Sequence, residues 1–152
     1  MKELTPDGIL IEEWDVVTSI SASIVNNIVD SDDSKIEQAL LKSLFSYLDY
    51  LELKYGKKAS ILATRADYED DVSIKESLLL GAYDVASSDN DSRNKTFVSS
   101  SLAEFYIDEN ENENFESGEK WVGILEANLA IYHDEGEEQL LLELKQTISS
   151  KQ

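Results

Sequence analysis

The sequence contains a single histidine, His133, in surroundings that offer little of what hydrolytic catalysis needs. His133 precedes Asp134 at a point where a helix is expected to end, and a histidine there usually stabilises the negative end of the helix dipole or meets water. No serine stands in the Gly-x-Ser-x-Gly turn that presents a nucleophile. The chain has no cysteine, which excludes thiol catalysis and thiolate metal sites. We therefore expect that the protein is not an enzyme.

Carboxylates are the other groups in this chain that could do chemistry, and one stretch partly matches a calcium-binding loop. Counting from Asp108, oxygen-bearing side chains recur at the spacing of calcium ligands, at Asn110, Asn112, Asn114 and Glu119. The sharp turn of such a loop requires glycine at its sixth place, and Glu113 stands there. Phosphate loops and dinucleotide fingerprints are also missing. The sequence predicts no metal site and no cofactor.

Net charge is the strongest signal in the composition. The chain has 32 Asp and Glu against 13 Lys and Arg, a formal charge of -19. Such a charge repels nucleic acid and anionic membranes, and it accelerates encounter with a basic partner about 10- to 1000-fold at low salt. We expect a basic protein partner, with no direct nucleic-acid or membrane binding. The alternative is that the acidity only keeps the protein in solution.

Apolar residues recur with the period of a helix throughout the chain, and no segment alternates with the period of a strand. Ser34-Lys35-Ile36-Glu37 and Ser73-Ile74-Lys75-Glu76 read as capping boxes at helix starts, and Gly56 is placed to end a helix. The polar stretch 87–91 predicts a break between helices. The fold class is therefore all-α with about seven antiparallel helices, expected over about 13–29, 34–55, 59–68 and 73–86, then around 97–106, 118–132 and 140–148.

Short links between these helices favour a bundle or a packing like that of tetratricopeptide (TPR) repeats. A weak echo between Ser60–Ala66 and Ser100–Tyr106 supports the repeat version. We expect one domain over residues 1–152, with 1–12 and 150–152 loosely ordered. The sequence has neither a leader-like segment at its start nor an apolar run long enough to span a membrane, which predicts a cytoplasmic protein.

Two acidic segments are candidate partner-binding surfaces. The first combines four carboxylates with a candidate aromatic anchor at the end of a short helix: Asp67, Tyr68, Glu69, Asp70 and Asp71. The second, ranked lower because ordering a longer loop costs more entropy, contains Asp108, Glu109, Glu111 and Glu113. Tyr50, Tyr68 and Tyr83 fit the apolar stripes least well, so each is a candidate contact residue as well as a candidate core residue.

Three stretches give the chain its resemblance to a known class of proteins: residues 54–68, Leu80-Gly81-Ala82-Tyr83, and residues 101–106. Together with the linking sequence they span residues 54–106 and resemble small helical immunity proteins, which bacteria pair with polymorphic toxins of contact-dependent inhibition and type VI systems. The resemblance implies neutralisation of a cognate toxin, often a basic nuclease, by direct binding. It carries over no individual residue.

Two other classes of binding protein remain open. A DNA mimic, such as an anti-restriction protein, would array carboxylates along an elongated surface, because duplex DNA carries about one charge per 1.7 Å of axis. A helical-repeat adaptor would hold a peptide or protein in a groove, and only the internal echo supports it. A neighbouring toxin gene would favour the immunity protein.

Calcium binding gives a direct test of the acidic loop. We expect calorimetry to detect no micromolar binding, because Glu113 occupies the place where the loop needs glycine. Micromolar affinity that disappears in Asp108→Ala would contradict this expectation.

Overall fold

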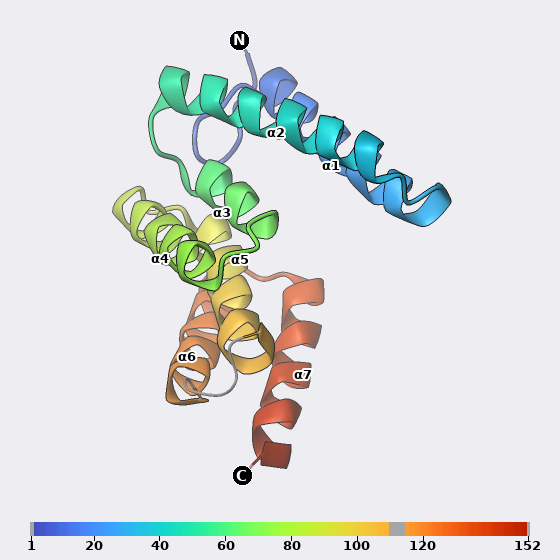
Figure 1. Cartoon of the computed structure of the whole chain (residues 1–152). Coiled ribbons are helices and arrows are strands. Elements are labelled where there is room, and N and C mark those ends of the chain that lie inside the picture. Colours follow the sequence, from blue (N-terminus) through green and yellow to red (C-terminus); the bar gives the residue numbers. More distant parts are fainter. Residues whose placement is uncertain (1, 110–114, 152) are drawn as a thin grey trace.

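The computed structural model describes residues 2–109 and 115–151. Over these residues the chain is all-α, as the sequence predicts (Figure 1). Apart from a single bridge between Leu4 and Leu10, the same residues form no β-structure. The helices are α1 (Ile11–Asp30), α2 (Ser34–Tyr55), α3 (Ala59–Asp67), α4 (Val72–Ser88), α5 (Ser92–Glu104), a π-helix (Phe105–Glu109), α6 (Phe115–Ile131) and α7 (Glu135–Lys151).

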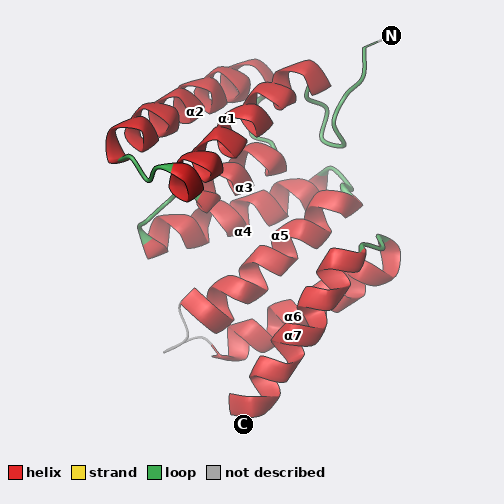
Figure 2. Ribbon diagram, turned by 90° about the vertical axis from the view of Figure 1, so that its right-hand side faces the viewer, coloured by secondary structure: helices red, strands yellow, loops and turns green. Residues whose placement is uncertain are grey.

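Most packing joins helices that follow one another in the chain (Figure 2). The hairpin of α1 and α2 extends away from the other helices, α3 packs on α4, α5 packs on both α4 and α6, and α7 covers α5 and α6. Both segments of the internal echo lie in the first helix of a packed pair, although the second runs on into the π-helix. None of the described helices combines the length and apolar character needed to cross a membrane.

Aspartates set the starts of α2 and α4, and this corrects the predicted capping boxes. The Asp33 carboxylate accepts hydrogen bonds from the amides of Lys35 and Ile36, so Asp33 caps α2 and Ser34 is its first residue. Asp71 caps α4 by accepting from Ile74 N, in the role that the capping box predicts for Ser73. Carboxylates outcompete hydroxyls here because they also interact with the positive end of the helix dipole. Gly56 ends α2 as predicted, with a positive φ of 82°.

The predicted break at 87–91 is narrower in the structure. Helix α4 continues to Ser88, and Asp91 caps α5, so that α5 begins with the polar turn Ser92–Lys95. Apolar periodicity does not reveal this turn because it is held by polar contacts. Its Asn94 donates a side-chain hydrogen bond to Asp91, and both residues are buried.

Buried apolar residues form two cores that meet at α3. One lies between the α1–α2 hairpin and the N-terminal segment, and it includes Ile9, Leu44, Leu48 and Ile61. The other fills the space among α3 to α7. Helix α3 supplies Ile61 to the first core and Leu62 and Ala66 to the second. The Arg65 guanidinium also pairs with Asp49 of α2 at 2.7 Å.

Helix α5 is the central element of the second core. It buries small polar side chains as well as apolar ones, among them Thr96, Ser99 and Ser100. The side-chain nitrogen Nδ2 of Asn128 on α6 lies 3.3 Å from Ser99 Oγ and 3.2 Å from the Tyr83 hydroxyl on α4. Because a buried polar group is costly without a partner, this contact fixes how the three helices sit against each other.

The end of α5 widens into the π-helix, which buries three successive residues, Phe105, Tyr106 and Ile107. Helix α6 approaches this turn closely at Gly118. A Cβ at Gly118 would stand 2.8 Å from Cγ1 of Ile107, so this position requires glycine unless Ile107 moves. The Lys151 ammonium donates to the carbonyl of Ile107 at 3.2 Å, which ties the end of α7 to the same turn.

The sequence predicts a loosely ordered segment over 1–12, whereas the structure ties it to α3. The buried carboxylate of Asp7 accepts hydrogen bonds from Ser60 N at 3.0 Å and Ser60 Oγ at 2.6 Å. An aspartate distant in sequence therefore caps the first turn of α3. Ile9, two residues further on, is fully buried in the first core.

Removal of the Asp7 carboxylate should weaken the whole fold. We expect Asp7→Ala to lower the free energy of unfolding by about 1 to 3 kcal/mol, because Ser60 N loses its acceptor in a buried place. Urea titration followed by circular dichroism measures this loss. Asp15→Ala on the exposed side of α1 is the control, with an expected change below about 0.5 kcal/mol. Equal effects of the two substitutions would contradict the assignment of Asp7 as a cap.

Candidate functional site

The alternating direction of the helices gathers carboxylates at one end of the molecule. Helices α3 and α5 finish there, and α4 and α6 begin there (Figure 2). We name this region the acidic end, and its described carboxylates are Asp67, Glu69, Asp70, Asp71, Glu104, Asp108, Glu116 and Glu119. The two acidic segments that the sequence offers as rival surfaces therefore contribute to the same end.

Contacts between α3, α4 and α5 hold the acidic end together. A small polar pocket of about 140 Å³ is lined by Asp67 of α3, Lys75 of α4, and Ser101 and Glu104 of α5. The Tyr106 hydroxyl donates to Glu76 of α4 at 2.6 Å. Burial is the main cause that raises the pKa of Tyr106, and the hydrogen bond to the Glu76 carboxylate raises it further. The tyrosine therefore remains a donor.

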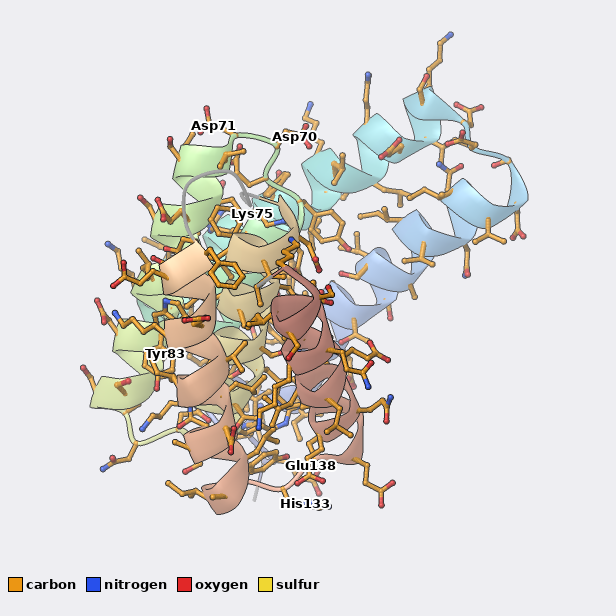
Figure 3. All side chains as sticks on the ribbon, turned by 90° about the horizontal axis from the view of Figure 1, so that it is seen from below. Asp70, Asp71, Lys75, Tyr83, His133 and Glu138 are labelled. Carbon is orange, nitrogen blue, oxygen red and sulfur yellow. The ribbon has the colours of Figure 1, made fainter. Side chains whose placement is uncertain are left out.

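Two of the five predicted residues at 67–71 also build the turn itself. Asp71 caps α4, and the Glu69 carboxylate accepts a hydrogen bond from Asp71 N at 3.1 Å. Tyr68 is half-buried and packs against the first core, so its ring is at least partly structural. Asp70 is exposed and lies at the outer edge of the turn beside Asp71 (Figure 3).

The second predicted segment is described only in part. Asp108 is exposed in the π-helix, and Glu109 ends that helix. Glu111 and Glu113 lie outside the described residues, as do Asn110, Asn112 and Asn114 of the calcium-like spacing. In residues 2–109 and 115–151, no three His, Asp or Glu side chains come together in a way that could hold a metal ion.

The other two tyrosine candidates, Tyr83 and Tyr50, have different surroundings. Tyr83 packs edge-on against Trp121 with ring centroids 4.9 Å apart, and its hydroxyl lies near Asn128, so it belongs to the second core. Tyr50 is 46 % exposed, but its hydroxyl is bonded to Glu13 across the hairpin.

His133 lies at the other end of the C-terminal helices from the acidic end (Figure 3). Its Nδ1 is 3.1 Å from Glu138 Oε1, and the side chain is 67 % exposed. Nearby, burial raises the pKa of the Glu137 carboxyl, an effect that a hydrogen bond from Ser100 opposes. Glu137 lies against α5 and does not line the pocket of the acidic end, so it takes no part in that site.

One polar cluster, centred on Glu13, is not predicted from the sequence. The Glu13 carboxylate on α1 accepts hydrogen bonds from the hydroxyls of Tyr55 and Tyr50 and pairs with Lys54 at 3.0 Å. The bond from Tyr55 is the main cause that lowers the pKa of Glu13 from 4.5 to about 2, against the opposing effect of burial. Because no periodic pattern links residue 13 with residues 50–55, local sequence contains no signal for this cluster. It closes the open end of the hairpin.

Comparison with protein-family models, curated proteins and solved structures finds no match to this chain. The functional interpretation therefore depends on the charge, the exposed surfaces and the grooves of the molecule itself.

The Glu13 cluster makes hairpin stability depend on pH. Because the pKa of Glu13 is depressed in the folded state, its contribution is complete above about pH 4.5 and is lost as the pH falls towards 2. Urea titrations between pH 5.5 and 2.5 should therefore show wild type losing its advantage over Glu13→Gln as the pH falls. Glu12→Gln, at an exposed neighbour, should track wild type at every pH. An advantage over Glu13→Gln that stays constant down to pH 2.5 would contradict the assignment.

Proposed function

We propose that the protein is an inhibitor that binds a basic protein partner through its acidic end, and that this partner is a toxin domain, as for immunity proteins. The observation that carries the proposal is the gathering of carboxylates from α3, α4, α5 and α6 at one end of a molecule whose net charge is -19. The proposal includes a cytoplasmic location and a mechanism that forms no covalent bond.

Electrostatics supports a basic partner. Carboxylates on one face attract a positive surface over about one Debye length, roughly 8 Å at physiological salt, and so raise the association rate. Asp70, Asp108 and Glu116 are exposed there and can meet lysine or arginine side chains. Rim charges of this kind contribute mainly to association rate and to the choice of partner.

A nuclease toxin fits this chemistry well. Such an enzyme must present Lys and Arg to the phosphates of its substrate, so an acidic protein can occupy the same surface and block access. The carboxylates of the acidic end come from the ends of four neighbouring helices and form a compact group, which suits an inhibitor of one compact site. Further carboxylates lie at the opposite ends of these helices, among them Asp84, Asp89 and Asp134.

Charge reversal at the acidic end tests the proposal. Affinity capture from the native host should yield a basic toxin domain, whose toxicity on expression alone is abolished by co-expression of this protein. Asp70→Lys should then slow association with the captured domain about 3-fold or more and flatten its dependence on salt. Asp70 is preferable to Asp71, because reversal at Asp71 would also remove the cap of α4.

Asp30→Lys is the matched control, since it makes the same change of charge at the far end of α1. An effect of Asp30→Lys as large as that of Asp70→Lys would remove the acidic end as the binding surface. Capture of a restriction enzyme that is not toxic to the host would instead favour a mimic, and capture of an uncharged peptide segment would favour an adaptor.

A further inference from the structure

A second surface feature lies beside the acidic end and is apolar. A groove of about 390 Å³ runs between α4 and the start of α3, lined by Leu62, Ile74, Leu78, Gly81, Val85 and Lys57. Pockets for drug-sized ligands span about 300 to 1,000 Å³. This groove is at the small end of that range, which suits one or two protein side chains.

The groove is open because α4 packs one face against the second core and turns a neighbouring face towards the groove. Leu79, Ala82 and Ala86 are buried against the second core. The groove residues of α4 recur every three or four positions, from Ile74 to Val85, and form an adjoining stripe. Two of them, Leu78 and Val85, also pack against the edge of the second core. Gly81 lies in the middle of this stripe. A Cβ at Gly81 would stand 3.8 Å from Cδ1 of Leu62, an ordinary contact, so the missing side chain leaves room that the packing of α3 does not demand.

The apolar surface of the groove is available for burial. Among the lining residues Ile74 is 50 % exposed, whereas Leu62 is buried. Val72, which does not line the groove, is 48 % exposed at the start of the same helix. Burial of such surface by a partner is favourable because it removes apolar area from water. Apolar residues are also exposed towards the far end of the α1–α2 hairpin, including Val25 and Val29, and they are the rival surface for an apolar partner.

The carboxylates that lie beyond the two ends of the groove favour a basic occupant. At one end, the carboxylate of Asp71 lies 3.0 Å from Ile74 N, and the exposed Asp70 precedes it. At the other end, the exposed Asp84 adjoins Val85, and Asp89 follows at the end of α4. Lys57 is the one charged residue among the described residues that line the groove, so the basic residues of an occupant must lie beyond the lining, next to the carboxylates at its two ends. An apolar centre with carboxylates at both ends complements a segment that has an apolar anchor and basic flanks.

We propose that the groove between α3 and α4 seats the apolar side chain of a basic amphipathic helix. The identity of this helix as part of the toxin domain rests on the proposed function, whereas the chemistry of the occupant follows from the groove alone. In this arrangement the anchor contacts Leu62, Ile74 and Leu78, while basic residues one turn away on either side reach Asp70 and Asp84. The groove then supplies the desolvated centre of the interface, and the acidic end supplies its rim.

A synthetic peptide tests the groove without knowledge of the partner. The probe is a peptide of about four helical turns made of leucine and lysine, with leucine at helical spacing and lysine elsewhere, and its control replaces each leucine by glutamine. Titrated into ¹⁵N-labelled protein, the leucine peptide should shift the amide signals of Ile74, Leu78, Gly81 and Val85. The glutamine peptide, of equal charge, should leave those signals in place. Shifts concentrated on Val25 and Val29 of the hairpin would overturn the proposal.

Filling the groove gives the decisive comparison. Gly81→Leu should lower affinity for the leucine peptide at least about 10-fold, because its side chain occupies the place of the anchor. Gly81→Ala, which helix propensity favours, should lower affinity in the same direction by a smaller factor. Gly123→Leu on α6 is the matched control, since a Cβ there meets nothing within 4 Å, and its affinity should equal that of wild type. Equal affinity of Gly81→Leu and wild type would overturn the proposal.

The toxin assay separates this inference from the proposed function. Neutralisation by wild type but not by Gly81→Leu supports both. Equal neutralisation by both proteins removes the groove from the interface and leaves the inhibitor intact. If the leucine peptide binds in the groove while no toxin is neutralised, the proposed function fails and the groove retains its basic amphipathic occupant.

Discussion

Helix α3 is nine residues long and supplies apolar side chains to two separate cores. Because an α-helix turns about 100° per residue, the neighbours Ile61 and Leu62 face different directions, one towards the α1–α2 hairpin and the other towards α4. So short a helix has little stability of its own. It is held by Asp7 at its first turn and by Arg65, which pairs with α2, near its last. The orientation of the hairpin and the position of the groove both depend on these contacts.

Apolar periodicity predicts the helices well where one face is broad and continuous, as in α2, whose Leu44, Leu48 and Leu51 are fully buried. It fails where polar groups do the packing. The first turn of α5 contains no large apolar residue, yet Asn94 in that turn and Thr96 just after it are buried. Asp91 accepts hydrogen bonds from Asn94, and the carbonyl of Ser92 accepts from the Thr96 hydroxyl. Nor does it distinguish Asp33 from Ser34 as a cap, since both types are strong candidates at adjacent positions.

The sequence predicts which segments of the candidate site are acidic, but it does not predict that the fold brings these segments together. Local sequence identifies Asp67 to Asp71 and the stretch from Asp108 as acidic, but only the antiparallel succession of helices brings Asp67 beside Glu104. Contacts across long separations have no local signal: Glu13 meets Tyr55, and Tyr83 meets Trp121. The groove depends on a glycine that lacks any motif around it. Gly81 matters because the space between it and Leu62 of α3 forms part of the groove.

The order in which the helices pack has a consequence for synthesis on the ribosome. Since each helix packs mainly on its neighbours in the chain, the average separation between contacting residues is small, which favours rapid folding. The first core contains Ile9, the α1–α2 hairpin and Ile61, so every buried residue of that core has been made once Ile61 has left the exit tunnel. The N-terminal part can therefore bury its apolar surface while α4 to α7 are still being translated. A nascent chain of this kind exposes little apolar surface at any one time, and so offers few opportunities for aggregation.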